Sequence, residues 1–70
     1  MNSKPYNELE DAVREDVRCH RENGVSLNPY STYGARTSWQ NGFDGKFASI
    51  TDYFVPYQRG RIAAQLIKEI

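Results

Sequence analysis

The segment 29–43 constrains the fold of this 70-residue chain more than any other part of it. It contains the only tryptophan, which belongs to a row of apolar residues spaced four apart: Ala35, Trp39, Phe43 and Phe47. In a helix this spacing turns the row by only about 40° per step, so the four side chains share one face. A chain of this length has little interior, and we expect its largest side chains there, Phe47 included.

The first third of the chain predicts an amphipathic helix over residues 7–23. Asn7 and Glu10 have the spacing of a capping pair, and Gly24 follows as a left-handed stop. The segment is charged except for an apolar stripe of residues four apart: Leu9, Val13 and Val17. We expect this stripe to be the face that the first helix buries.

The middle of the chain is open to two interpretations. The four-residue spacing favours a helix that begins near residue 32 and ends near residue 43 or 47. An Asn-Gly pair at 41–42 and an Asp-Gly pair at 44–45 are, however, strong hairpin signals. The apolar run that follows could then be a strand, which gives an α+β alternative with a hairpin at 38–55.

The last third predicts an aromatic connector followed by a short amphipathic helix over residues 58–69. Its apolar stripe again has the four-residue spacing, with two further apolar residues beside it: Ile62, Leu66 and Ile70, then Ala63 and Ile67. This stripe and the connector carry more apolar surface than so small a core can cover. A homodimer is therefore one expected use of that surface.

A set of residues in a fixed order resembles the ribosome modulation factor family. The matching residues are Gly24, Asn28, Pro29, Tyr30, Arg36, Trp39, Gly42 and Phe43. The resemblance covers roughly residues 12–47, and most of the matching residues have the character of architectural positions. The resemblance therefore implies the fold more directly than the function.

The fold that the resemblance implies is all-α. An antiparallel helix pair, over about 7–23 and 32–45, would be joined by an Asn-Pro-Tyr turn, with Gly42 as the small residue where the first helix crosses. The helix at 58–69 would then be a C-terminal extension of a single domain over residues 1–70.

The composition excludes several classes of protein. A single cysteine rules out an internal disulfide and a cysteine-rich zinc site. No apolar run approaches the about 20 residues of a membrane span, and the polar N-terminus lacks the core of a signal peptide, so we expect a soluble, cytoplasmic protein without a membrane partner. Nine basic and nine acidic residues give a formal net charge of zero, whereas nucleic-acid-binding domains usually carry a positive excess.

No catalytic constellation is present in the sequence. The only histidine, His20, is adjacent to Cys19, and neighbouring side chains on a helix point about 100° apart, so the two do not form a nucleophile pair. Paired carboxylates, metal-ligand spacings and a phosphate-binding glycine loop are all missing. We therefore expect no enzymatic activity, no metal and no cofactor.

The candidate core residues are the large apolar ones of the first two helices and the turn between them: Leu9, Val13, Val17, Tyr30, Trp39 and Phe43. The candidate RNA- or partner-binding residues are mainly cationic: Arg36, Lys46, Tyr57, Arg59 and Arg61. Arg59 and Arg61 beside Tyr57 at a helix start suit phosphate contact and base stacking, a solvated turn being the alternative. Arg36 would hold an acidic residue of the first helix, or reach a phosphate or a partner's carboxylate.

Two classes of function follow from these observations. The resemblance implies a non-enzymatic accessory protein that binds the ribosome or ribosomal RNA and modulates translation, as the family does by promoting inactive, hibernating ribosome dimers. The alternative is a small bacterial or phage regulator that binds a host protein through its helical and aromatic surface. The zero net charge favours the second class.

Overall fold

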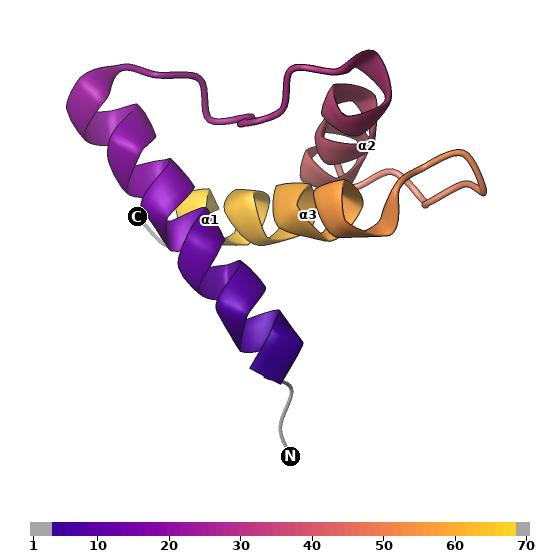
Figure 1. Cartoon of the computed structure of the whole chain (residues 1–70), viewed down its shortest axis with the longest axis horizontal. Helices are drawn as coiled ribbons and strands as arrows, with labels where there is room; N and C mark the ends of the chain where they lie inside the picture. Colours follow the sequence, from indigo (N-terminus) through magenta and orange to yellow (C-terminus); the bar gives the residue numbers. More distant parts are fainter. Residues whose placement is uncertain (1–3, 69–70) are drawn as a thin grey trace.

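The computed structural model describes the backbone of residues 4–68 and the side chains of residues 8–68, and this part of the chain forms three α-helices (Figure 1). α1 spans Lys4–Asn23, α2 spans Tyr33–Phe43 and α3 spans Phe54–Lys68. Residues 4–68 contain no strand. The all-α prediction is confirmed, and the alternative with a hairpin at 38–55 is wrong.

α1 begins three residues before the predicted start at Asn7. Pro5 falls in its first turn, where a missing N–H leaves no helical hydrogen bond unmade, so the helix extends past Asn7. The predicted end at Asn23 is confirmed. Gly24 has the left-handed φ of 73°, and its N–H donates to the carbonyl oxygen of His20 at 3.1 Å.

α2 ends at Phe43, which confirms the earlier of the two predicted ends, and does not reach residue 45 or 47. Gly45, with φ 77°, turns the chain away, and its N–H donates to the carbonyl oxygen of Gly42 at 3.2 Å. Because the helix stops, Phe47 does not continue the row formed by Trp39 and Phe43, and its side chain is fully exposed. The prediction that Phe47 belongs to the core is wrong.

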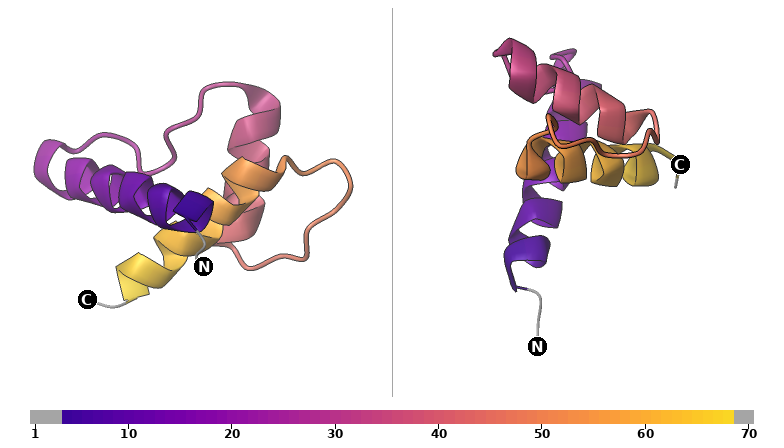
Figure 2. Two further views of the ribbon diagram at one scale, coloured as in Figure 1. Left: turned by 60° about the horizontal axis from the view of Figure 1, so that its bottom comes forward. Right: turned by 90° about the vertical axis from the view of Figure 1, so that its right-hand side faces the viewer.

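α3 begins four residues before the predicted residue 58 and packs against both other helices. Pro56 again lies in the first turn, where proline is tolerated. The predicted end at residue 69 lies outside the described residues. In Figure 1, α3 runs across the middle of the molecule, and the two further views in Figure 2 show α2 on one side of it and α1 crossing it on another. The helix predicted as a C-terminal extension, α3, is thus the central helix of the fold.

Two glycines allow α2 and α3 to approach closely. A Cβ on Gly42 would overlap the carbonyl oxygen of Tyr57, and a Cβ on Gly60 would overlap that of Trp39. The two helix backbones are therefore in contact where these residues face each other. Gly42 is a crossing point as predicted from the resemblance, but the prediction that the first helix crosses there is wrong, because the crossing helix is α3.

The core lies where the three helices meet. Its buried members are Val13, Val17, Trp39, Ile62, Ala63 and Leu66, with Leu9, Leu27, Tyr30, Phe43 and Ile67 packed against them. All six predicted core residues are in one of these two groups. The indole of Trp39 is 3% exposed and stacks on Phe43, with ring centroids 5.0 Å apart.

The connector between α1 and α2 is held by the residues that carry the family resemblance. Asn28 is buried; its side-chain amide donates to the carbonyl oxygen of Arg36 at 3.2 Å and its Oδ1 accepts from the N–H of Tyr30 at 3.1 Å. Arg36 in turn donates to the carbonyl oxygen of Tyr30 at 2.9 Å. This guanidinium therefore braces the turn, and the prediction that it holds an acidic residue of the first helix is wrong.

Candidate functional site

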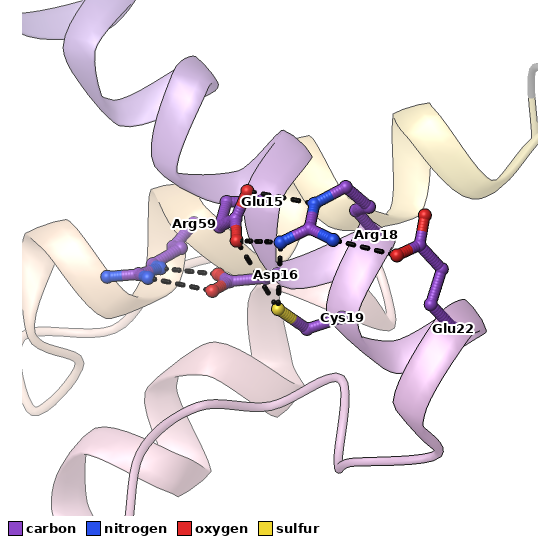
Figure 3. Close-up of polar contacts among 6 residues, drawn as sticks. All are labelled: Glu15, Asp16, Arg18, Cys19, Glu22 and Arg59. Carbon is purple, nitrogen blue, oxygen red and sulfur yellow. Dashed lines mark hydrogen bonds and ion pairs between the residues drawn. The ribbon is translucent and has the colours of Figure 1, made fainter.

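Arg59 is occupied by an ion pair between α3 and α1. Its guanidinium donates to both carboxylate oxygens of Asp16, at 2.8 and 3.0 Å, and the two side chains are only 22% and 14% exposed (Figure 3). The same guanidinium lies over the ring of Tyr30, 5.5 Å from its centroid. The hydrogen bond with Asp16 raises the pKa of Arg59. This residue joins two helices and does not present the unpaired guanidinium that phosphate contact requires.

Tyr57 is also part of the structure rather than of a binding surface. Its side chain is buried, and its hydroxyl donates to the carbonyl oxygen of Lys46. A base cannot stack on a ring that is covered in this way, so the stacking role predicted for Tyr57 is not what the structure provides.

The other three cations among the predicted binding residues are exposed, but they do not form one cluster. Within residues 8–68, Arg36, Lys46 and Arg61 take part in no ion pair. Arg61 lines a shallow groove of about 190 Å³ that it shares with Lys68 and Asp44. Arg36 instead lines a second groove on α2. The five predicted binding residues are therefore not gathered into one site.

Ion pairs within α1 occupy much of its charged surface. Arg14 pairs with Glu10 at 2.8 Å, and Arg18 pairs with both Glu15 and Glu22 (Figure 3). The hydrogen bond from Arg18 lowers the pKa of Glu15. Such exposed pairs within a helix contribute little to stability. Because α1 contains six acidic and four basic residues, it keeps a small acidic excess, which does not suit a phosphate backbone.

The Cys19 thiol is not an activated nucleophile. It donates to a carboxylate oxygen of Glu15 at 3.4 Å, and this hydrogen bond raises its pKa, which keeps the thiol protonated. His20 faces elsewhere, with Nδ1 donating to the carbonyl oxygen of Val25 at 2.7 Å. Across the part of the chain that the structure describes, no cluster of His, Cys, Asp and Glu is placed to hold a metal ion. None of the described helices is both long and apolar enough to cross a bilayer.

The feature that stands out is an apolar patch on the loop 44–53 and the first residues of α3. Its members, with their exposed fractions, are Phe47 (100%), Ile50 (102%), Tyr53 (60%), Phe54 (74%) and Val55 (50%). Figure 1 and Figure 2 show the loop projecting outward from the three helices. Five apolar side chains at such exposures within the nine residues 47–55 are a high density for a monomeric protein, where exposed apolar residues are usually scattered singly.

The loop is fixed to the helices at several points. The N–H of Lys46 donates to the carbonyl oxygen of Asn41 at 3.0 Å, and the N–H of Tyr53 donates to the hydroxyl of Ser38 at 2.8 Å. The hydroxyl of Tyr57, on α3, also donates to the carbonyl oxygen of Lys46. The two ends of the loop are therefore anchored on α2 and α3, and the patch is displayed on a defined backbone.

The polar side chain of Asp52 is used inside the loop. One carboxylate oxygen accepts from the N–H of Ser49 at 2.9 Å, and the other accepts from the side chain of Asn41 at 3.0 Å. These hydrogen bonds, the one from Ser49 first, lower the pKa of Asp52. The carboxylate of Asp52 thus bonds to the protein, while Phe47 and Ile50 face water together with the other polar residues of the loop.

Compared with protein-family models, with curated proteins and with solved structures, the chain matches none of them.

Proposed function

We propose that this chain is a small, non-enzymatic protein-binding domain of the cytoplasm, in which three helices display the apolar patch to a partner. The observation that carries the proposal is the loop itself, in which Asp52 bonds to Ser49 and Asn41 while Phe47 and Ile50 are fully exposed. Large apolar side chains exposed at this density are a common mark of a surface that binds another protein.

The patch has the properties of an interaction hot spot. Aromatic anchors dominate such sites, and burying a fully exposed Phe or Ile side chain stabilises a complex by about 1.5–3 kcal/mol. The hydrogen bonds of Ser38, Asn41 and Asp52 hold the loop before any partner arrives. Less conformational entropy is then lost on binding, which strengthens association without further contacts.

Charge favours a protein partner over a lipid surface. The loop and the start of α3 contain one cation, Lys46, and two acids, Asp44 and Asp52. Stable attachment to anionic lipid needs basic residues beside the inserted apolar ones. An uncharged aromatic patch with a slightly acidic rim instead suits an apolar pocket on another protein.

The proposal is tested by capture from host lysate with the wild type and two variants. The double variant Phe47→Ser/Ile50→Ser removes the two most exposed members of the patch, while Val25→Ser changes an apolar side chain, 49% exposed, on the connector. We expect wild type and Val25→Ser to retain the same protein and the double variant to lose it at least tenfold, because two anchors are gone. Equal retention by all three would contradict the proposal.

The resemblance to the ribosome modulation factor family motivates a second candidate, binding to the ribosome or ribosomal RNA. The observation in its favour is the groove that Arg61 shares with Lys68, since two exposed cations on one edge of α3 could contact phosphates. Co-sedimentation with ribosomes at low and raised salt tests it. Binding that falls steeply with salt and is weakened by Arg61→Ala supports this candidate, whereas no binding at low salt excludes it.

A further inference from the structure

We propose that the occupant of the apolar patch is a second copy of this chain, in a two-fold dimer in which Phe47 of each copy enters a groove on α2 of the other. This inference rests on the proposed function and names the partner of the same surface.

The receiving groove lies on the outer side of α2 and measures about 340 Å³. It is lined by Asn28, Tyr33, Arg36, Thr37, Gln40 and Asn41. Its volume is at the lower end of pockets that receive small molecules, which suits one large side chain. Tyr33, at the edge of the groove, is 86% exposed, so a second copy could also bury this aromatic ring.

The groove and the loop adjoin each other on one copy. Asn41, in the groove lining, donates to Asp52 of the loop, and the ring of Tyr53 lies against Gly34 of α2, with Cε2 2.6 Å from where a Cβ would stand. A two-fold axis beside this junction lets the loop of each copy meet the groove of the other. Both contacts then form at once, as an isologous interface requires.

The area and charge of this surface suit self-association. At its exposed fractions the patch offers on the order of 600 Å² of apolar surface, and Tyr33 adds more, which approaches the about 800 Å² per partner of a standard interface. The patch carries no charged side chain, and the whole chain has zero formal net charge. Two copies therefore meet without the like-charge repulsion that keeps many small proteins apart.

The oligomeric state tests the inference directly. Sedimentation velocity over a range of roughly 1 to 500 µM, which brackets micromolar dimers, should shift from the 8.1 kDa monomer to twice that mass. Tyr33→Ser, in the groove, and Phe47→Ser/Ile50→Ser, in the loop, should each raise the dimer dissociation constant at least tenfold. Val25→Ser is the matched control and should dimerise as wild type does. Circular dichroism confirms that each variant is folded, as expected for substitutions of exposed side chains.

A disulfide experiment locates the contact. In a Cys19→Ser background, Phe47→Cys protein is mixed with Gln40→Cys protein and oxidised. The inference predicts that the mixed disulfide exceeds the Phe47→Cys homodimer, because residue 47 enters the groove beside Gln40 of the other copy. If the Phe47→Cys homodimer dominated, the two loops would lie against each other, and the inference that Phe47 binds in the groove would be overturned.

Failure of this inference is distinguishable from failure of the proposed function. A chain that stays monomeric throughout, yet captures another protein through Phe47 and Ile50, overturns the dimer and keeps the protein-binding role. A monomer that instead co-sediments with vesicles of phosphatidylserine and phosphatidylcholine overturns both.

Discussion

Adding one methyl group at the crossing of α2 and α3 should destabilise the fold measurably. In Gly60→Ala the new Cβ would overlap the carbonyl oxygen of Trp39 and stand 2.9 Å from the N–H nitrogen of Phe43. Both neighbours are backbone atoms of α2, so no side chain can rotate to relieve the clash. The helices must separate, and the contacts of the Trp39 indole with α3 loosen with them.

Two opposing effects set the size of this change. Alanine in place of glycine favours a helix interior by about 1 kcal/mol. Overpacking of a closed contact costs typically about 1–3 kcal/mol and more where backbone must move, so the cost should win and leave a net loss of about 2 kcal/mol. For a domain of this size such a loss lowers Tm by roughly 10 °C.

Thermal and urea denaturation followed by circular dichroism measure the effect, with Gly34→Ala as the matched control. There the Cβ meets only the ring of Tyr53, which is 60% exposed and can turn aside. Helix propensity should then dominate, and Gly34→Ala should be as stable as wild type or more stable by up to about 1 kcal/mol. If Gly60→Ala proved as stable as Gly34→Ala, the close crossing described here would be refuted.

Three further predictions concern the core, the ion pair and the loop. Trp39→Ala should cost about 3–5 kcal/mol, comparable to the total stability of a domain this small, and its helical signal should be largely lost at 25 °C; a folded variant would mean that the indole is not central. Asp16→Ala and Arg59→Ala should each cost about 2 kcal/mol, below the cost for a fully buried pair because both side chains keep some exposure, and a double-mutant cycle by urea denaturation should give a clear coupling energy; additive losses would contradict the pairing. The pKa of Asp52 is lowered on folding from its ordinary 3.8, so its contribution to the loop is present above that pH and is lost as pH falls through the lower folded value. The protection factor of the Ser49 amide, its exchange rate relative to the intrinsic rate at the same pH, should therefore show a loss of protection in acid in the wild type and no such pH dependence in Asp52→Asn; identical profiles would show that the carboxylate does not hold the loop.

The three helices could be predicted from the sequence because local signals agree there. Leu9, Val13 and Val17 mark one stripe, and Gly24 ends α1 where the pattern ends. The sequence predicts starts for α1 and α3 that are three and four residues too late, because Pro5 and Pro56 can occupy a first helical turn and so do not mark a boundary.

The packing partner of Gly42 could not be predicted, because it depends on a contact between residues distant in sequence. Gly60 is the matching small residue, and it lies inside α3 because that helix begins at Phe54, four residues before the predicted start. A resemblance limited to the first two helices could not reveal that the third one is central.

In the candidate site, too, the features that depend on contacts between residues distant in sequence could not be predicted. The sequence predicts Arg59 as a binding residue. Its ion-pair partner, Asp16, lies 43 residues away, so no local pattern in the sequence indicates the pair. The apolar patch left a weaker signal: Asp44 and Gly45 stop the helix, and Phe47 then falls outside any helical row. Whether such a residue faces inward or outward depends on the path of the loop, which is held by contacts such as Asn41–Asp52 between residues distant in sequence, and no spacing rule captures these.

The most direct measurement of the central claim is site-specific photo-crosslinking in living host cells. A photoreactive phenylalanine analogue replaces Phe47 in one strain and Val25 in another, both being exposed positions that tolerate the change. The account predicts a discrete protein adduct, of this chain or of another, from position 47 and little or none from position 25. An equal yield from both positions, or no adduct from position 47, would contradict the claim that the loop is the surface through which this protein works.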